Sequence, residues 1–113
     1  MTNPDHIDKL KDGVVAWNQW RTANDPLLRP DFTGANLGNA DLRGMNLHGA
    51  SLLGVKASGV DFGGSDLRFS ILTNADLTDA NLSGADLSNA DFAGAILTPA
   101  LFAFCPRTSA DVC

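Results

Sequence analysis

A large apolar residue recurs at every fifth position of the chain from Phe32 to Phe102, without an insertion or a deletion. A period of five fits neither the 3.6-residue turn of an α-helix nor the two-residue alternation of a strand. Each block of five therefore needs a turn of its own. Fourteen of the fifteen block centres are Leu or Phe, and Ala57 is the exception. The predicted core centres are Phe32, Leu37, Leu42, Leu47, Leu52, Phe62, Leu67, Leu72, Leu77, Leu82, Leu87, Phe92 and Leu97.

The positions around each centre are just as regular. The residue two before the centre is Ala in nine blocks, the residue directly before it is Asp or Asn in ten, and the last residue is often Gly or Asn. Gly and Asn accept the backbone angles of a tight turn. The pattern therefore predicts one large and one small inward side chain per block, with the other three positions facing solvent.

The commonest block, A(D/N)LxG, resembles the repeat of the pentapeptide repeat family over residues 30–104. The resemblance implies an all-β solenoid, a right-handed quadrilateral β-helix in which four pentapeptides form one square coil. About 15 pentapeptides then give just under four coils, stacked about 4.8 Å apart as strands are. Residues 105–113 are expected to form a C-terminal tail.

Residues 1–29 lack the repeat and predict an N-terminal α-helical cap. Asn3, Pro4 and Asp5 have the residue types preferred at a helix start, and Asn24, Asp25 and Pro26 predict its end. The sequence therefore predicts one helix between them. Its apolar residues recur at helical spacing and should pack on the first coil; they are Ile7, Leu10, Val14, Trp17 and Trp20.

Charge narrows the choice of partners. The net charge is −5, and all thirteen acidic residues are Asp. This acidity argues against direct binding to nucleic acid, which needs Lys and Arg to neutralise phosphates. The sequence has no apolar run long enough to span a membrane and no apolar leader, so we expect a cytoplasmic protein with no membrane partner. Whether Cys105 and Cys113 form a disulfide is left open by the sequence.

Four blocks per coil assign each outward residue before a centre to one of four faces. Face one carries Asp31, Ser51, Ile71 and Asp91; face two Asn36, Lys56, Asp76 and Ile96; face three Asp41, Asp61, Asn81 and Leu101; face four Asn46, Asp66 and Asp86. Faces three and four thus share a candidate acidic strip of Asp41, Asp61, Asp66 and Asp86, with Arg43, Arg68 and His48 beside it. These carboxylates either serve the fold and its solubility or mimic the charge of DNA, as is proposed for gyrase-binding members of the family.

Two apolar features are candidate contact sites. Leu53, Phe69 and Ile71 occupy outward positions around face one and form a candidate apolar contact patch. Leu101, Phe102 and Phe104 crowd the last blocks and form a candidate C-terminal dimer contact. The resemblance supports the second site, because some family members form homodimers through their C-terminal ends.

The sequence carries no sign of catalysis. Its two histidines, His6 and His48, lie in the cap and on the solenoid surface, and no spacing suggests a nucleophile, a phosphate-binding loop or a metal site. We therefore expect no enzyme and no cofactor. The favoured hypothesis is a protein–protein interaction module or structural scaffold with an unassigned protein partner. The alternatives are an acidic DNA mimic that acts on a DNA-binding protein such as DNA gyrase, and a spacer domain of a larger protein.

Overall fold

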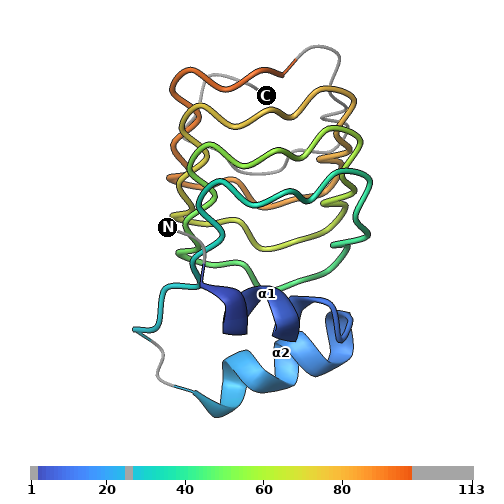
Figure 1. The fold of residues 1–113 in the computed structure, drawn as a ribbon, viewed down its shortest axis with the longest axis vertical. Coiled ribbons are helices and arrows are strands. Elements are labelled where there is room, and N and C mark those ends of the chain that lie inside the picture. The colour runs from blue at the N-terminus through green and yellow to red at the C-terminus, as the bar shows by residue number, and fades with distance from the viewer. Residues whose placement is uncertain (1–2, 25–26, 98–113) are drawn as a thin grey trace.

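A computed structural model describes residues 3–24 and 27–97 of the 113-residue chain. Two helices, α1 (Pro4–Leu10) and α2 (Val14–Ala23), lie at one end of a stack of square coils, and the chain then winds away from them (Figure 1). The fold is therefore a β-solenoid with a helical N-terminal segment.

Each coil contains twenty residues, because every β-bridge joins residue i to residue i+20 in parallel. Strand pairing is limited to isolated bridges in the described residues. This follows from the repeat, since a turn in every five residues leaves one residue per block to bridge the next coil. The bridged residues are those directly before the centres, so the four predicted faces are the faces of the structure as far as it is described.

The turns use the left-handed backbone region at the last position of the blocks. Gly occupies many of these positions, and Asn39, Asn74, Asp79 and Asn89 adopt the same region with φ near 60°. Asn and Asp tolerate this conformation better than other residues with side chains. Phe69 also adopts it, with φ of 60°, although a bulky residue is strained there.

The core is the column of block centres predicted from the repeat. The centres from Phe32 to Leu87 are buried, while Phe92 and Leu97, in the last described coil, are half-buried and pack against the others. Ala57 is fully buried between Val55 and Val60, which are larger than the usual Ala at their positions and are also fully buried. The larger flanking residues thus offset the small centre, as close packing requires.

The N-terminal segment differs from its prediction, because it forms two helices instead of one. Asn3 caps α1 as expected, and its Oδ1 accepts a hydrogen bond of 2.9 Å from the backbone N–H of Asp5. The helix ends before Gly13, whose φ of +100° is outside the range of a helix. Gly13 then serves as the N-cap residue of α2.

This break explains which apolar residues reach the core. Leu10 and Trp17 are buried against the first coil, and Ile7 and Trp20 are half-buried beside them. Val14 was expected in the same group and is more exposed than the others, at 36%, although its Cγ2 lies near Gly44 of the first coil. With the chain turning at Gly13, Val14 starts a new helix and no longer continues the apolar side of α1.

Candidate interaction surface

The acidic strip lies where the sequence places it, but two arginines neutralise much of it. Bridges align Asp41 with Asp61 on face three and Asp66 with Asp86 on face four. Arg43 donates two hydrogen bonds of 2.9 Å to Asp41, and its Nε lies 3.8 Å from Asp61.

Arg68 repeats this arrangement on face four. It donates hydrogen bonds of 2.9 and 2.8 Å to Asp66, and its Nε lies 3.9 Å from Asp86. Each arginine therefore spans two stacked carboxylates, and the strip carries half the charge that four aspartates would carry alone. A paired strip of this kind is a weaker imitation of a phosphate backbone than the sequence suggests.

The same arginines lower the pKa values of two of these carboxyl groups. Hydrogen bonds from the Arg43 side chain and backbone lower the pKa of Asp41 to about 2. Burial raises the pKa of Asp66, but hydrogen bonds from Arg68 outweigh it and leave that pKa below its ordinary value. Both groups are therefore ionised at neutral pH.

The carboxylates and amides before the centres also have a role in the fold. Each accepts a hydrogen bond from the backbone N–H two residues later, as in Asp61 to Gly63 at 2.9 Å and Asp91 to Ala93 at 3.0 Å. This is the Asx-turn that Asp and Asn favour. The abundance of Asp and Asn thus has a structural cause that requires no partner.

The apolar contact patch spans face one, with Phe69 at the turn from face four and Leu53 at the turn towards face two. Phe69 is 50% exposed, Leu53 is 39% exposed, and Ile71 is half-buried on face one between them. The ring of Phe69 meets the edge of the His48 ring at 5.5 Å and 85°. The structure therefore leaves these three side chains at the surface, as the sequence predicted.

A shallow hollow of about 280 Å³ adjoins Phe69. It is lined by Leu27, Leu28, Arg29, His48, Gly49 and Phe69. Leu27, Leu28 and Phe69 supply apolar side chains to it, and Arg29 and His48 supply polar ones. The apolar contact patch therefore continues from face one into a concave surface, which sequence reasoning missed.

Sequence reasoning also missed the polar residues that join the helices to the first coil. Trp17 and Arg21 both donate to the carbonyl of Asn46, at 2.8 and 3.0 Å, and Arg21 donates at 3.0 Å to the carbonyl of His48. Asn18 accepts from the backbone N–H of Asn46 at 2.8 Å. These side chains thus pair with the N–H and carbonyl groups of Asn46 and with the carbonyl of His48.

Face one of the first coil is joined to α1 in a similar way. The imidazole Nδ1 of His6 accepts a hydrogen bond of 2.9 Å from the N–H of Asp31, and the N–H of Asn3 donates to the carbonyl of Asp31 at 2.9 Å. Burial lowers the pKa of His6, although Asp31 and Asp5 act in the opposite direction. The unprotonated ring that this contact needs is therefore favoured.

Two of the predicted features of the C-terminal end lie beyond the part of the chain that the structure describes. Leu101, Phe102 and Phe104 lie outside the described residues, as do Cys105 and Cys113. Residues 3–24 and 27–97 contain no group of three metal-binding side chains. Neither α1 nor α2 has the length and apolar character needed to cross a bilayer.

Comparisons with known proteins agree on one family. The model for pentapeptide repeats matches residues 31–64 and 61–98, which together exceed half of the chain. Comparison with curated proteins gives no match.

Three solved structures are similar to the chain. HetL of Nostoc sp. strain PCC 7120, a pentapeptide repeat protein involved in the regulation of heterocyst differentiation, is 34% identical over 65% of this chain and 36% of its own, with a TM-score of 0.43. Rfr23 of Cyanothece 51142 is 24% identical over 66% of each chain, with a TM-score of 0.50. A third pentapeptide repeat protein, alr5209 of Nostoc PCC 7120, is 35% identical over 77% of this chain and 73% of its own, with a TM-score of 0.41.

The extent of these matches differs. The chain spans about a third of the length of HetL and just under two thirds of that of Rfr23. The likeness to Rfr23 bears on the fold alone, whereas the family model matches the repeat block by block. The match to the family model over more than half of the chain, with the twenty-residue coils and their column of Leu and Phe, shows that the chain belongs to the pentapeptide repeat family.

Proposed function

We propose that the chain is a non-enzymatic module that binds a protein partner through the apolar contact patch of Leu53, Phe69 and Ile71. Pentapeptide repeat proteins are in general non-enzymatic repeat modules. A surface for a partner must therefore be sought on the outside of the solenoid, where the side chains leave the regular pattern.

The strained and exposed position of Phe69 is the main support for this proposal. It occupies a left-handed turn position that is Gly, Asn or Asp in the other described blocks, and half of its side chain is exposed. A bulky residue in this region costs about 1–2 kcal/mol, and the exposed ring gains little burial in return. Backbone strain of this kind is a reason to look for function at that residue.

The surroundings of Phe69 support the same surface. Leu53 and Ile71 add apolar area on face one, and the hollow lined by Leu28 and His48 adds a concave apolar area beside it. Exposed apolar clusters at the surface of a soluble domain often mark contact sites. The acidic strip offers less, because Arg43 and Arg68 already occupy its carboxylates.

The proposal is tested by affinity capture from the source cells, with the immobilised chain and the variant Phe69→Asp. Asp79 holds the same turn position with φ of 60°, so this variant is expected to keep the fold. Ile96→Asp is the matched control, because Ile96 is a similarly exposed apolar residue on face two. A partner retained by Ile96→Asp and lost by Phe69→Asp supports the proposal, whereas equal capture by both variants contradicts it.

The N-terminal cap and the number and hand of the coils are also proposed. We infer that residues 1–29 cap the N-terminal end, and that the fifteen blocks of residues 30–104 complete just under four right-handed coils. The hydrogen bonds from Trp17 and Arg21 to the edge of the first coil support the capping role. A cap of this kind protects a solenoid end from pairing with other chains.

A further inference from the structure

The N-terminal edge of the first coil is closed on two faces and open on the other two. On faces four and one, side chains or backbone of the helical segment pair with the N–H and carbonyl groups of Asn46 and Asp31. On faces two and three, the N–H and carbonyl groups of Asn36 and Asp41 have no hydrogen-bond partner among the described residues.

Two further carbonyls extend this open edge. Gly38 and Arg43 are equivalent to His48, whose carbonyl accepts from Arg21, but their own carbonyls accept no hydrogen bond in the described part of the chain. The corresponding groups of the second coil are all paired, since the N–H of Lys56 donates to Ala35 and its carbonyl accepts from Leu37. The open edge therefore presents the groups that another coil would engage.

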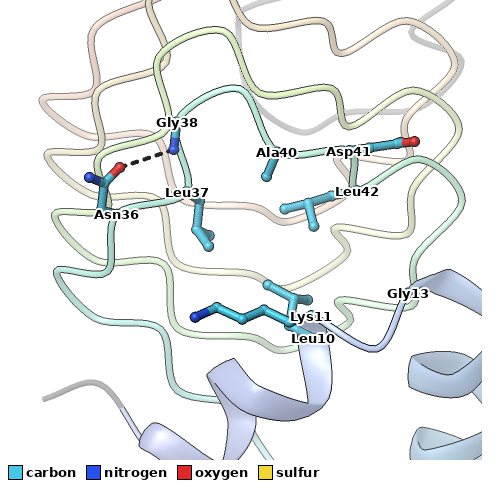
Figure 2. Close-up of a pocket in the computed structure, with 9 residues that line it drawn as sticks. All are labelled: Leu10, Lys11, Gly13, Asn36, Leu37, Gly38, Ala40, Asp41 and Leu42. Carbon is cyan, nitrogen blue, oxygen red and sulfur yellow. Dashed lines mark hydrogen bonds between the residues drawn. The ribbon is translucent and has the colours of Figure 1, made fainter.

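A groove of about 310 Å³ runs along this open edge, between faces two and three and the turn that joins α1 to α2 (Figure 2). Leu10, Leu37 and Leu42 form its apolar floor. The edge is therefore accessible, and it adjoins a surface that can receive an apolar side chain.

The groove also has a charge preference. The side chain of Lys11 extends along it (Figure 2), and its ammonium group forms no ion pair within the described residues. Asp41 lies on the opposite side, but Arg43 holds its carboxylate in two hydrogen bonds of 2.9 Å. The unpaired charge in the groove is thus positive, which favours a carboxylate in whatever binds there.

We infer that this groove binds an extended acidic peptide segment of a partner protein. The segment pairs through its backbone with Asn36 and Asp41 and places a carboxylate beside Lys11. Exposed strand edges bind peptides in this manner, with main-chain hydrogen bonds that supply affinity and side-chain pockets that supply specificity. The site is separate from the apolar contact patch, which lies on the other side of the first coils, around face one.

The probe is a blocked decapeptide, ANLSGADLSN, which copies residues 80–89 and so has the sequence of two successive faces of a coil with one aspartate. It is titrated into the full ¹⁵N-labelled chain, and the amide signals are followed by NMR. Saturable shifts at Asn36 and Asp41 are expected. Shifts confined to other residues, or no shifts at millimolar peptide, would overturn the inference.

Charge variants test the role of Lys11. Lys11→Glu should weaken binding of the decapeptide by about threefold or more, because the variant removes an exposed ion pair and adds repulsion between like charges. Lys9→Glu is the matched control, since Lys9 pairs with Asp12 and does not line the groove. Equal affinity of the two variants would contradict the carboxylate contact.

Two altered peptides complete the test. A decapeptide with asparagine in place of its aspartate should bind wild type and Lys11→Glu equally. A decapeptide with N-methylated backbone amides should lose binding, because it cannot donate to the open carbonyls. Concentration-dependent shifts at Asn36 and Asp41 without any peptide would identify a second copy of the chain as the occupant and would overturn the peptide inference.

Discussion

At the scale of single residues, the outward and inward positions obey different rules. Outward Asp and Asn residues close Asx-turns, so their frequency reflects the geometry of the block. Inward residues must be apolar or must satisfy their own hydrogen bonds. Ser65 and Ser70 are two inward residues that replace the usual Ala, and of the two only Ser70 meets this requirement.

These two serines give a prediction with its own control. The hydroxyl of Ser65 is buried and has no hydrogen-bond partner among the described residues, whereas that of Ser70 donates at 2.7 Å to the carbonyl of Leu67. Because an unsatisfied buried polar group costs about 1–3 kcal/mol, Ser65→Ala should raise the free energy of unfolding by about 1 kcal/mol. Ser70→Ala should leave it unchanged or lower it. Urea denaturation measures both, and an equal change in the two variants would contradict the assignment.

At the scale of elements, the helical segment and the first coil meet through polar contacts as well as apolar packing. The contact of His6 with Asp31 is sensitive to pH, because a ring protonated on Nδ1 can no longer accept the backbone hydrogen bond. Trp20 and Phe32 lie against the same ring, at 5.6 and 6.5 Å between ring centroids, and His6 is buried. Protonation of His6 should therefore weaken the junction between α1 and face one.

The pKa of His6 sets the direction of this effect. Burial lowers the pKa below 6.5 in the folded chain, so the unfolded chain takes up the proton at higher pH than the folded chain. The stabilising contact is complete above pH 6.5 and is lost as the pH falls through that value towards the folded pKa. The carboxyl groups of Asp31, Asp41, Asp66 and Asp76 have pKa values below 3.8 and do not titrate in this window.

Denaturation at pH 7.5 and pH 5 measures this prediction, with the fluorescence of Trp17 and Trp20 as the signal of the helical segment. Wild type should be less stable at pH 5, and His6→Gln should lose most of that difference. The prediction fails if His6→Gln keeps the same pH dependence, or if NMR titration places the folded pKa above 6.5.

At the scale of the whole molecule, the repeat made the core and faces predictable, while the junctions were not. Leu72 could be assigned to the core because it is the third residue of its block, and that residue is Leu or Phe in fourteen of the fifteen blocks. The structure buries it fully. Arg21 follows no such pattern. It is buried because it donates to the carbonyls of Asn46 and His48 in the first coil. The positions of these two carbonyls follow from the folded structure and have no sequence signal.

Some of what sequence reasoning missed did have a local signal. Gly13 interrupts an otherwise helical segment, and its freedom to adopt positive φ could have indicated the break between α1 and α2. The left-handed backbone of Phe69 could likewise be inferred from its place at the end of a block. The groove beside Lys11 had no such signal, because it depends on how far the helices extend across the end of the solenoid.

Stability in such a stack is a sum of contacts between neighbouring coils, so the cost of a cavity depends on its place in the column. Leu67 is fully buried, with the centres of coils below and above it, whereas Leu97 is half-buried in the last described coil. Leu67→Ala should therefore lower the free energy of unfolding by about 2–5 kcal/mol, and Leu97→Ala by clearly less. Chemical denaturation of the two variants measures the difference, and equal losses would contradict it.

The block around Ala57 indicates how the cavity in Leu67→Ala can be filled again. Ala57 is tolerated as a centre because Val55 and Val60 flank it, but Leu67 is flanked by Ser65 and Ser70, which are too small to compensate. Adding Ser65→Val and Ser70→Val to Leu67→Ala places an alanine centre between two valines, as around Ala57. Leu67 is the centre on face four of the same coil, two faces after Ala57. The triple variant should recover part of the lost stability, because the added methyl groups fill volume that the missing leucine leaves. If the triple variant is less stable than Leu67→Ala alone, neighbouring blocks do not exchange volume in this way, and the burial of Ala57 needs another cause.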